Sequence, residues 1–78
     1  MNKLVLKEAT QEYIIYLYQP EGRGDFGEVK LDLTNDSEDI LSKPEEDDTG
    51  YYAHKAAYRI RQYVKENSFP LHSIQAWY

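Results

Sequence analysis

The chain has 78 residues and a formal net charge of −5 at pH 7, and 41% of its residues are hydrophobic. This length holds one hydrophobic core, so we expect residues 1–78 to form a single small domain or one half of an obligate dimer. The absence of cysteine excludes disulfides, thiolate nucleophiles and zinc–thiolate or iron–sulfur sites, and the negative charge disfavours binding to nucleic acid and to anionic membranes.

The first half of the chain predicts an antiparallel meander. Residues 3–7 place Leu4 and Leu6 on one face of a first strand. Residues 12–18 (EYIIYLY) are β-branched and aromatic, and both of their faces are apolar, which is typical of a central strand. Residues 28–33 alternate between apolar and charged side chains, as half-buried antiparallel strands do.

A glycine-rich segment joins the second and third of these strands. From Gly22 to Gly27, with Val29 after it, the sequence matches the glycine loop of protein kinases and the dinucleotide-binding fingerprint. The chain lacks the other motifs that phosphoryl transfer needs, and a strand rather than a helix follows the glycines. We therefore interpret the segment as a hairpin loop in which glycine supplies positive φ angles and Phe26 packs back on the sheet.

Acidic residues gather in the next part of the chain. Eight acids and a single base, Lys43, lie between Asp32 and Asp48. Within this region, Ile40 and Leu41 predict a short edge strand. The acids nearest the following helix predict a solvated loop, in which an Asp or Thr side chain caps the first free N–H groups.

A single helix is predicted from about Tyr51 to about Glu66, ending at Asn67. His54, Tyr58, Arg61 and Lys65 are expected on its outward face. Apolar side chains recur on the other face at spacings of three and four, and the alanines among them allow close packing on a sheet. This inward face comprises Tyr52, Ala53, Ala56, Ala57, Ile60, Tyr63 and Val64.

Taken together, the predicted fold is α+β: a meander of three to four antiparallel strands packed by one C-terminal α-helix. Residues 71–78 (LHSIQAWY), after Pro70, are expected to dock as a short tail or an added strand. A single helix covers one face of such a sheet. We expect the covered face to carry Tyr13, Ile15, Leu17, Val29, Leu31 and Leu33, and the reverse face to carry Val5, Ile14, Tyr16 and Tyr18 beside Lys30 and Asp32.

Exposed tyrosines framed by charge are typical of protein–protein contact surfaces. We therefore expect Ile14, Tyr16 and Tyr18 to form a partner-binding surface. The alternative is that Trp77 and Tyr78, or a loop, simply cover this face.

Residues with the spacing of a catalytic or metal site are not found. His54 and His72 are too far apart for a helical zinc motif, and no serine lies in a G-x-S-x-G turn. The residues after Asp32 begin like a calcium loop, but Ser37 and Lys43 replace its required glycine and glutamate. We therefore expect no enzymatic activity, no cofactor and no metal.

The chain resembles a family of small bacterial proteins without an assigned function. The resemblance covers most of the chain and implies a bacterial, cytoplasmic setting, but no activity. It rests on Gln19-Pro20-Glu21-Gly22 and Gly27-Glu28-Val29 in the hairpin, Tyr52-Ala53 at the helix start, and Phe69-Pro70 before the terminal Ala76-Trp77-Tyr78.

Three hypotheses of function follow from these patterns. The favoured one is a non-enzymatic interaction or regulatory module that binds an unknown protein or a second copy of itself. The second is an acidic inhibitor that imitates nucleic acid through the acids from Asp36 to Asp48 and binds a DNA-binding protein. The third is nucleotide binding through the loop from Gly22 to Gly27. We expect a cytoplasmic location, because no segment has the pattern of a signal peptide or a transmembrane helix.

Overall fold

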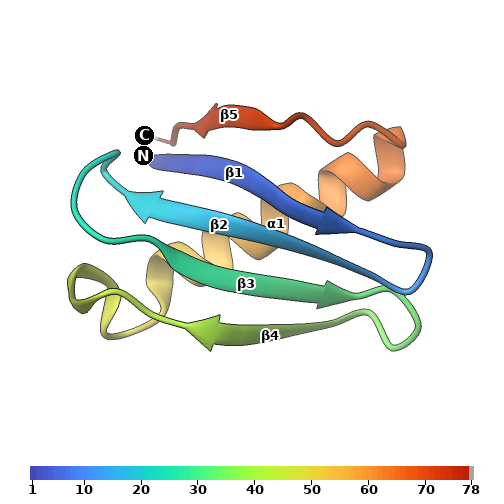
Figure 1. Cartoon of the computed structure of the whole chain (residues 1–78), viewed down its shortest axis with the longest axis horizontal. Coiled ribbons are helices and arrows are strands. Elements are labelled where there is room, and N and C mark those ends of the chain that lie inside the picture. Colours follow the sequence, from blue (N-terminus) through green and yellow to red (C-terminus); the bar gives the residue numbers. More distant parts are fainter. Residues whose placement is uncertain (78) are drawn as a thin grey trace.

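The structure is a computed structural model that describes residues 1–77. Its five strands form one antiparallel sheet in the order β4-β3-β2-β1-β5, and the helix crosses one face of this sheet (Figure 1). The predicted α+β meander with one C-terminal helix is thus confirmed. The elements are β1 (Asn2–Ala9), β2 (Tyr13–Pro20), β3 (Gly27–Asp32), β4 (Ser37–Ser42), the 3₁₀ turn η1 (Glu45–Asp47), α1 (Tyr51–Glu66) and β5 (His72–Gln75).

The helix α1 has the predicted bounds and connects the two edges of the sheet. It follows the edge strand β4 and leads to β5, which pairs antiparallel with β1 at the opposite edge. Asn67 ends the helix in the left-handed conformation, with a φ of 52°, and its N–H donates back to the helix. Asparagine tolerates this conformation better than most residues with a Cβ atom. The C-terminal segment, expected as a docked tail or an added strand, forms β5, which the chain reaches after residues 68–71.

The core lies between α1 and the sheet. Alanines at three helical positions are fully buried, which brings the helix backbone close to the strands. The side chains that fill this layer from the sheet include two tyrosines whose hydroxyls find partners. The core residues are Leu4, Ile14, Tyr16, Tyr18, Val29, Leu31, Ala53, Ala56, Ala57, Ile60 and Tyr63.

Our prediction of the two sheet faces was wrong for β2. In the β2–β3 pairing, Ile14 lies opposite Leu31 and Tyr16 lies opposite Val29, and directly opposed residues of antiparallel strands point to the same face. Ile14, Tyr16 and Tyr18 are therefore buried beneath α1, with exposed fractions of 1%, 0% and 0%. They cannot form a contact surface on the folded domain.

The reverse face instead carries Tyr13, Ile15 and Leu17 from β2, and Val5 from β1, which lies opposite Leu17. Alternation could not decide between the two faces, because both are apolar in β2. A hydrogen bond favours the observed orientation of β2: the buried hydroxyl of Tyr16 donates to the carbonyl oxygen of Pro70 at 2.7 Å. Burial, with a contribution from Tyr63, raises the pKa of Tyr16 to about 12, so this hydroxyl keeps its proton.

The glycine-rich segment is a hairpin loop between β2 and β3. Gly22 and Gly24 have φ angles of 72° and 84°, as the hairpin interpretation requires. Phe26 is 40% exposed and does not pack back on the sheet as expected. Gly27 serves a different purpose: a Cβ atom there would lie 2.4 Å from the ring of Tyr18. Its missing side chain makes room for this buried tyrosine.

The carboxylate of Asp47 caps α1 from outside the helix. Its two oxygens accept the N–H of Tyr52 at 2.8 Å and the N–H of Ala53 at 3.0 Å. The hydroxyl of Tyr18 donates to the same carboxylate at 2.7 Å. An acidic cap was expected, but Gly50 occupies the position next to the first helical residue, with a φ of 80°. The left-handed turn at Gly50 leaves the capping role to Asp47 in η1, a residue that is 2% exposed.

Asp47→Ala should lower the free energy of unfolding by about 2 to 3 kcal/mol, because it leaves two helix N–H groups and the Tyr18 hydroxyl without their acceptor. Tyr18→Phe should cost about 1 to 2 kcal/mol for the lost hydrogen bond to a charged group. Urea unfolding followed by circular dichroism measures both values. If Asp47→Ala is too unstable to analyse, Asp47→Asn replaces it.

The double variant should lose less than the sum of the two single losses, because both changes remove the same hydrogen bond. Asp48→Ala is the matched control: its side chain is exposed, and its effect should stay within about 0.5 kcal/mol. Strict additivity of Asp47→Ala and Tyr18→Phe would contradict the coupling described above.

Candidate functional site: a cleft beside the helix

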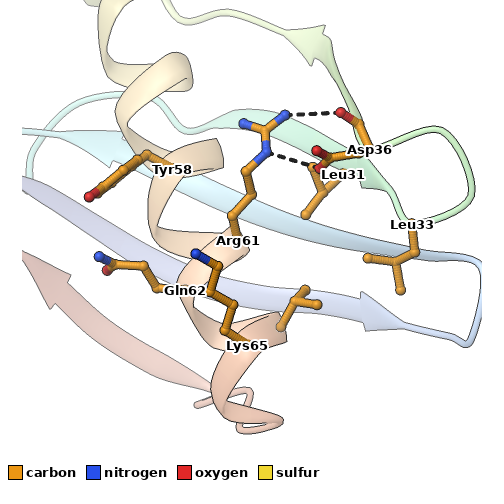
Figure 2. A pocket seen from close by; sticks show the side chains of 8 residues that line it. Leu31, Leu33, Asp36, Tyr58, Arg61, Gln62 and Lys65 are labelled. Atoms are coloured by element: carbon orange, nitrogen blue, oxygen red, sulfur yellow. Dashed lines mark hydrogen bonds and ion pairs between the residues drawn. The ribbon is translucent and has the colours of Figure 1, made fainter.

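A cleft of about 440 Å³ lies between the C-terminal half of α1 and the end of β3 with the turn that follows it (Figure 2). Its apolar part consists of Leu31, Leu33 and Val64. Leu31 belongs to the core, whereas Leu33 and Val64 pack at its margin and stay half-buried. The polar lining residues are Asp36, Tyr58, Arg61, Gln62 and Lys65.

One face of α1 supplies most of this lining. Tyr58, Arg61, Gln62 and Lys65 follow one another at spacings of three, one and three, which places them along one side of the helix. Tyr58 is 60% exposed and Lys65 is also exposed. The outward position that the sequence predicted for Tyr58 and Lys65 is therefore confirmed.

Arg61 fastens the edge strand β4 and its preceding turn to the helix. Its guanidinium donates from Nε to Asp36 Oδ1 at 3.2 Å and from Nη1 to Glu38 Oε1 at 3.0 Å; Figure 2 shows it bending toward Asp36. His54 contacts the other oxygen of Glu38 at 3.0 Å. The positive charge of Arg61 is therefore paired with Asp36 and Glu38 within the fold.

The charges of this cluster shift one another's pKa values. The hydrogen bond to Glu38, reinforced by Asp36, raises the pKa of Arg61. Burial alone would raise the pKa of Glu38, but the hydrogen bonds from His54 and Arg61 outweigh burial and lower it. The cluster therefore favours a charged Glu38 in the folded state.

Lys65 is the positive charge of the cleft that remains available. No ion pair within residues 1–77 involves Lys65. In Figure 2, its ammonium lies on the side of Arg61 that faces away from Asp36, toward Gln62. A carboxylate at this end of the cleft would meet an ammonium and an amide, while an apolar group would meet Leu33 and Val64.

A second hollow, of about 320 Å³, lies beside the glycine-rich loop. Its lining includes Glu21, Arg23 and Glu46. The carboxylate of Glu46 lies against Gly24, and that of Glu21 binds the N-terminal ammonium at 3.0 Å and the hydroxyl of Tyr52 at 2.6 Å. Two carboxylates beside one arginine disfavour a phosphate group, so the hollow gives the nucleotide hypothesis no support.

Several acids that precede the helix are engaged within the fold. Asp36 and Glu38 bind Arg61, Asp47 caps α1, and the Asp32 carboxylate accepts the N–H of Thr34 at 2.8 Å. A surface that imitates nucleic acid needs an array of free negative charges. Asp39, Glu45, Glu46 and Asp48 nevertheless stay exposed and form no ion pair within residues 1–77, so the inhibitor hypothesis stays a prediction that the structure does not test.

The cleft contains none of the residues that the sequence analysis assigned to partner binding. Ile14, Tyr16 and Tyr18 lie in the core beneath the helix. Sequence reasoning had placed Tyr58 and Lys65 on the outward helix face without assigning them a role. The sequence does not show that the turn after β3 lies beside this face. That placement depends on the direction in which α1 crosses the sheet.

The tail packs on the other end of the helix. Trp77 lies against the rings of Tyr51 and Tyr52, with centroid distances of 6.0 and 5.6 Å. The expected docking of the tail is thus confirmed for Trp77, but on the helix rather than on the reverse sheet face; Tyr78 lies outside the described residues. Lys55 Nζ lies 5.6 Å from the centroid of the Trp77 ring.

Within residues 1–77, no group of three or more His, Asp or Glu side chains could hold a metal ion. The helix in this part of the chain is neither long nor apolar enough to cross a membrane. Comparisons with protein-family models, with curated proteins and with solved structures give no match to this chain. The resemblance to a family of small bacterial proteins therefore stays a prediction.

Replacing Glu38 by Gln should make stability less dependent on acid pH. Because the folded state lowers the pKa of Glu38 below its ordinary value of 4.5, the folded protein binds fewer protons than the unfolded chain in that range. The stabilisation by Glu38 is thus complete above the unfolded pKa and is lost as the pH falls through the folded pKa. Urea unfolding at a series of pH values from neutral to acid should show E38Q less stable than wild type at neutral pH, with the difference shrinking on acidification.

Asp39→Asn is the control for this series, since Asp39 is the exposed neighbour of Glu38 on β4. Its stability should follow that of the wild type at every pH. A constant difference between wild type and E38Q across the whole range would show that the carboxylate charge is not what Glu38 contributes.

Proposed function

We propose that this chain is a non-enzymatic binding module, and that the cleft beside α1 holds a protein segment with an apolar side chain next to a carboxylate. The observation that carries the proposal is the pairing of Leu33 and Val64 with Lys65, a cation that no acid within residues 1–77 neutralises. Apolar area supplies affinity in such sites, and a few polar groups fix orientation.

The size and shape of the cleft support a side chain of a protein rather than a large cofactor. A volume of about 440 Å³ falls at the small end of the range for ligand sites. Tyr58, which is 60% exposed, stands at its border. A tyrosine in such a position buries a large area on binding and loses little conformational freedom, because its side chain is short and rigid.

The lining residues favour binding over catalysis. They include no serine, threonine, cysteine or histidine, and the carboxylate of Asp36 is held by Arg61. Tyr58 and Lys65 also carry ionisable groups, but acid–base or nucleophilic catalysis needs such groups within hydrogen-bond reach of one another, and no hydrogen bond within residues 1–77 involves either side chain. A cytoplasmic protein partner is part of the proposal, in keeping with a chain that contains no cysteine.

N-acetyl-leucine tests the cleft with the smallest probe that has both features, an apolar side chain and a carboxylate. Its titration into ¹⁵N-labelled protein should shift the amide signals of Leu33, Val64 and Lys65. We expect a Kd on the order of 1 mM, as the size of the probe allows. N-acetyl-leucinamide, which lacks the charge, should bind about threefold more weakly, because an exposed ion pair contributes less than about 1 kcal/mol.

Lys65→Gln should remove the difference between the acid and the amide, while the apolar contribution to binding persists. Lys55→Gln is the matched control, because Lys55 lies at the Trp77 end of the same helix and should not affect either probe. Shifts that avoid Leu33, Val64 and Lys65, or an equal preference for both probes in the wild type, would refute the proposal.

A further inference from the structure

The two edges of the sheet differ in charge and regularity. The edge strand β4 carries Glu38 and Asp39, and its pairing with β3 shifts register between Glu28 and Val29. Charged side chains and bulges are devices that keep an edge strand from pairing with another chain. The edge strand β5 has neither: residues 67–78 contain no Asp, Glu, Lys or Arg, and its pairing with β1 is regular.

The outer side of β5 presents backbone groups that are free to pair. On the inner side, the N–H of Leu6 donates to the carbonyl of Leu71 at 2.9 Å, in the same register that places Leu4 opposite Ser73. In an antiparallel ladder, hydrogen-bonded and non-hydrogen-bonded pairs alternate. The N–H and C=O groups of His72 and Ile74 therefore point away from β1, toward the outer edge.

Side chains on both sides hold β5 in an extended conformation. The amide of Gln75 is buried and donates to the carbonyl of Lys55 at 2.7 Å, and Asn2 donates to the oxygen of the same amide at 3.2 Å. The hydroxyls of Ser73 and Tyr63 form a hydrogen bond of 2.7 Å. A strand ordered in this way loses little entropy when it pairs with another strand.

The exposed apolar side chains of this edge have no cover within residues 1–77. Ile74 is 55% exposed and Leu71 is 66% exposed. Trp77 does not shield them, since it lies against the rings of Tyr51 and Tyr52 on the helix. The edge therefore combines free backbone groups, ordered geometry and exposed apolar side chains.

We propose that two copies of this chain pair through β5, antiparallel across a two-fold axis, with Ile74 opposite Ile74 of the second copy. This register brings the outward backbone groups of the two strands together and pairs apolar with apolar side chains. No like charges oppose each other at β5, whereas the same symmetric pairing at β4 would bring Glu38 and Asp39 close to their copies. The result is one continuous sheet across both copies, with the two helices on the same side.

A second copy fits this edge better than a charged partner. The edge offers no side-chain charge to a partner strand, and its pattern complements itself under the two-fold rotation. Four residues of β5 bury little area, below that of a standard stable interface, so the dimer should form reversibly and depend on concentration. The proposal is independent of the cleft, because none of the cleft residues lies in β5.

Ile74→Cys tests the pairing directly, because the chain has no other cysteine. Directly opposed, hydrogen-bonded residues of antiparallel strands have Cα atoms about 5.5 Å apart, which suits a disulfide. Under mild oxidation, I74C should form a disulfide-linked dimer at least about tenfold faster than Ile40→Cys, since only the former is held opposite its copy. Ile40 is the matched control, as it is 38% exposed on the other edge strand.

Sedimentation velocity of the unmodified protein gives the second readout. The wild type should associate as its concentration rises, and Ile74→Lys should remove this association with an unchanged circular dichroism spectrum, because the side chain is exposed. Equal rates of cross-linking for I74C and I40C, or a wild type that stays monomeric at every concentration, would overturn the proposal. So would free hydrogen exchange of the His72 and Ile74 amides in a concentrated sample.

Discussion

The buried carboxylate of Asp47 connects the two layers of this domain at one end. It accepts two N–H groups of α1 and the hydroxyl of Tyr18 on the central strand, so the start of the helix and the sheet share one acceptor. Two glycines make this possible, since Gly27 leaves space for the Tyr18 ring and Gly50 turns the chain so that Asp47 faces the helix. The position of α1, and with it the cleft, follows from this junction.

Sequence patterns predicted the elements and most of their faces, but not the orientation of β2. Alternation in β3, the three-and-four spacing of α1 and Asn67 at its end depend on local rules, and the structure agrees with them. The orientation of β2 could not be read in this way, because both of its faces are apolar. It depends on partners far away in sequence, such as Asp47 for Tyr18 and Pro70 for Tyr16.

The cleft illustrates why a site can be harder to predict than a fold. Tyr58 and Lys65 were recognisable as outward helix residues, yet an outward residue becomes part of a site only when another segment lies beside it. Leu33 provides that segment, just after the end of β3. Arg61 keeps the two segments together through Asp36 and Glu38. Arg61 is thus held in place by its two ion pairs, whereas Lys65, one helical turn further on, forms no ion pair within residues 1–77.

The strand β1 has features of an edge strand, although β5 pairs with its outer side. It lies second from the edge, yet its pairing with β2 carries a bulge between Leu6 and Glu8, and lysines occupy its reverse side at Lys3 and Lys7. These are the features of a protected edge strand. Such features disfavour pairing of β1 with another chain whenever β5 is detached from it.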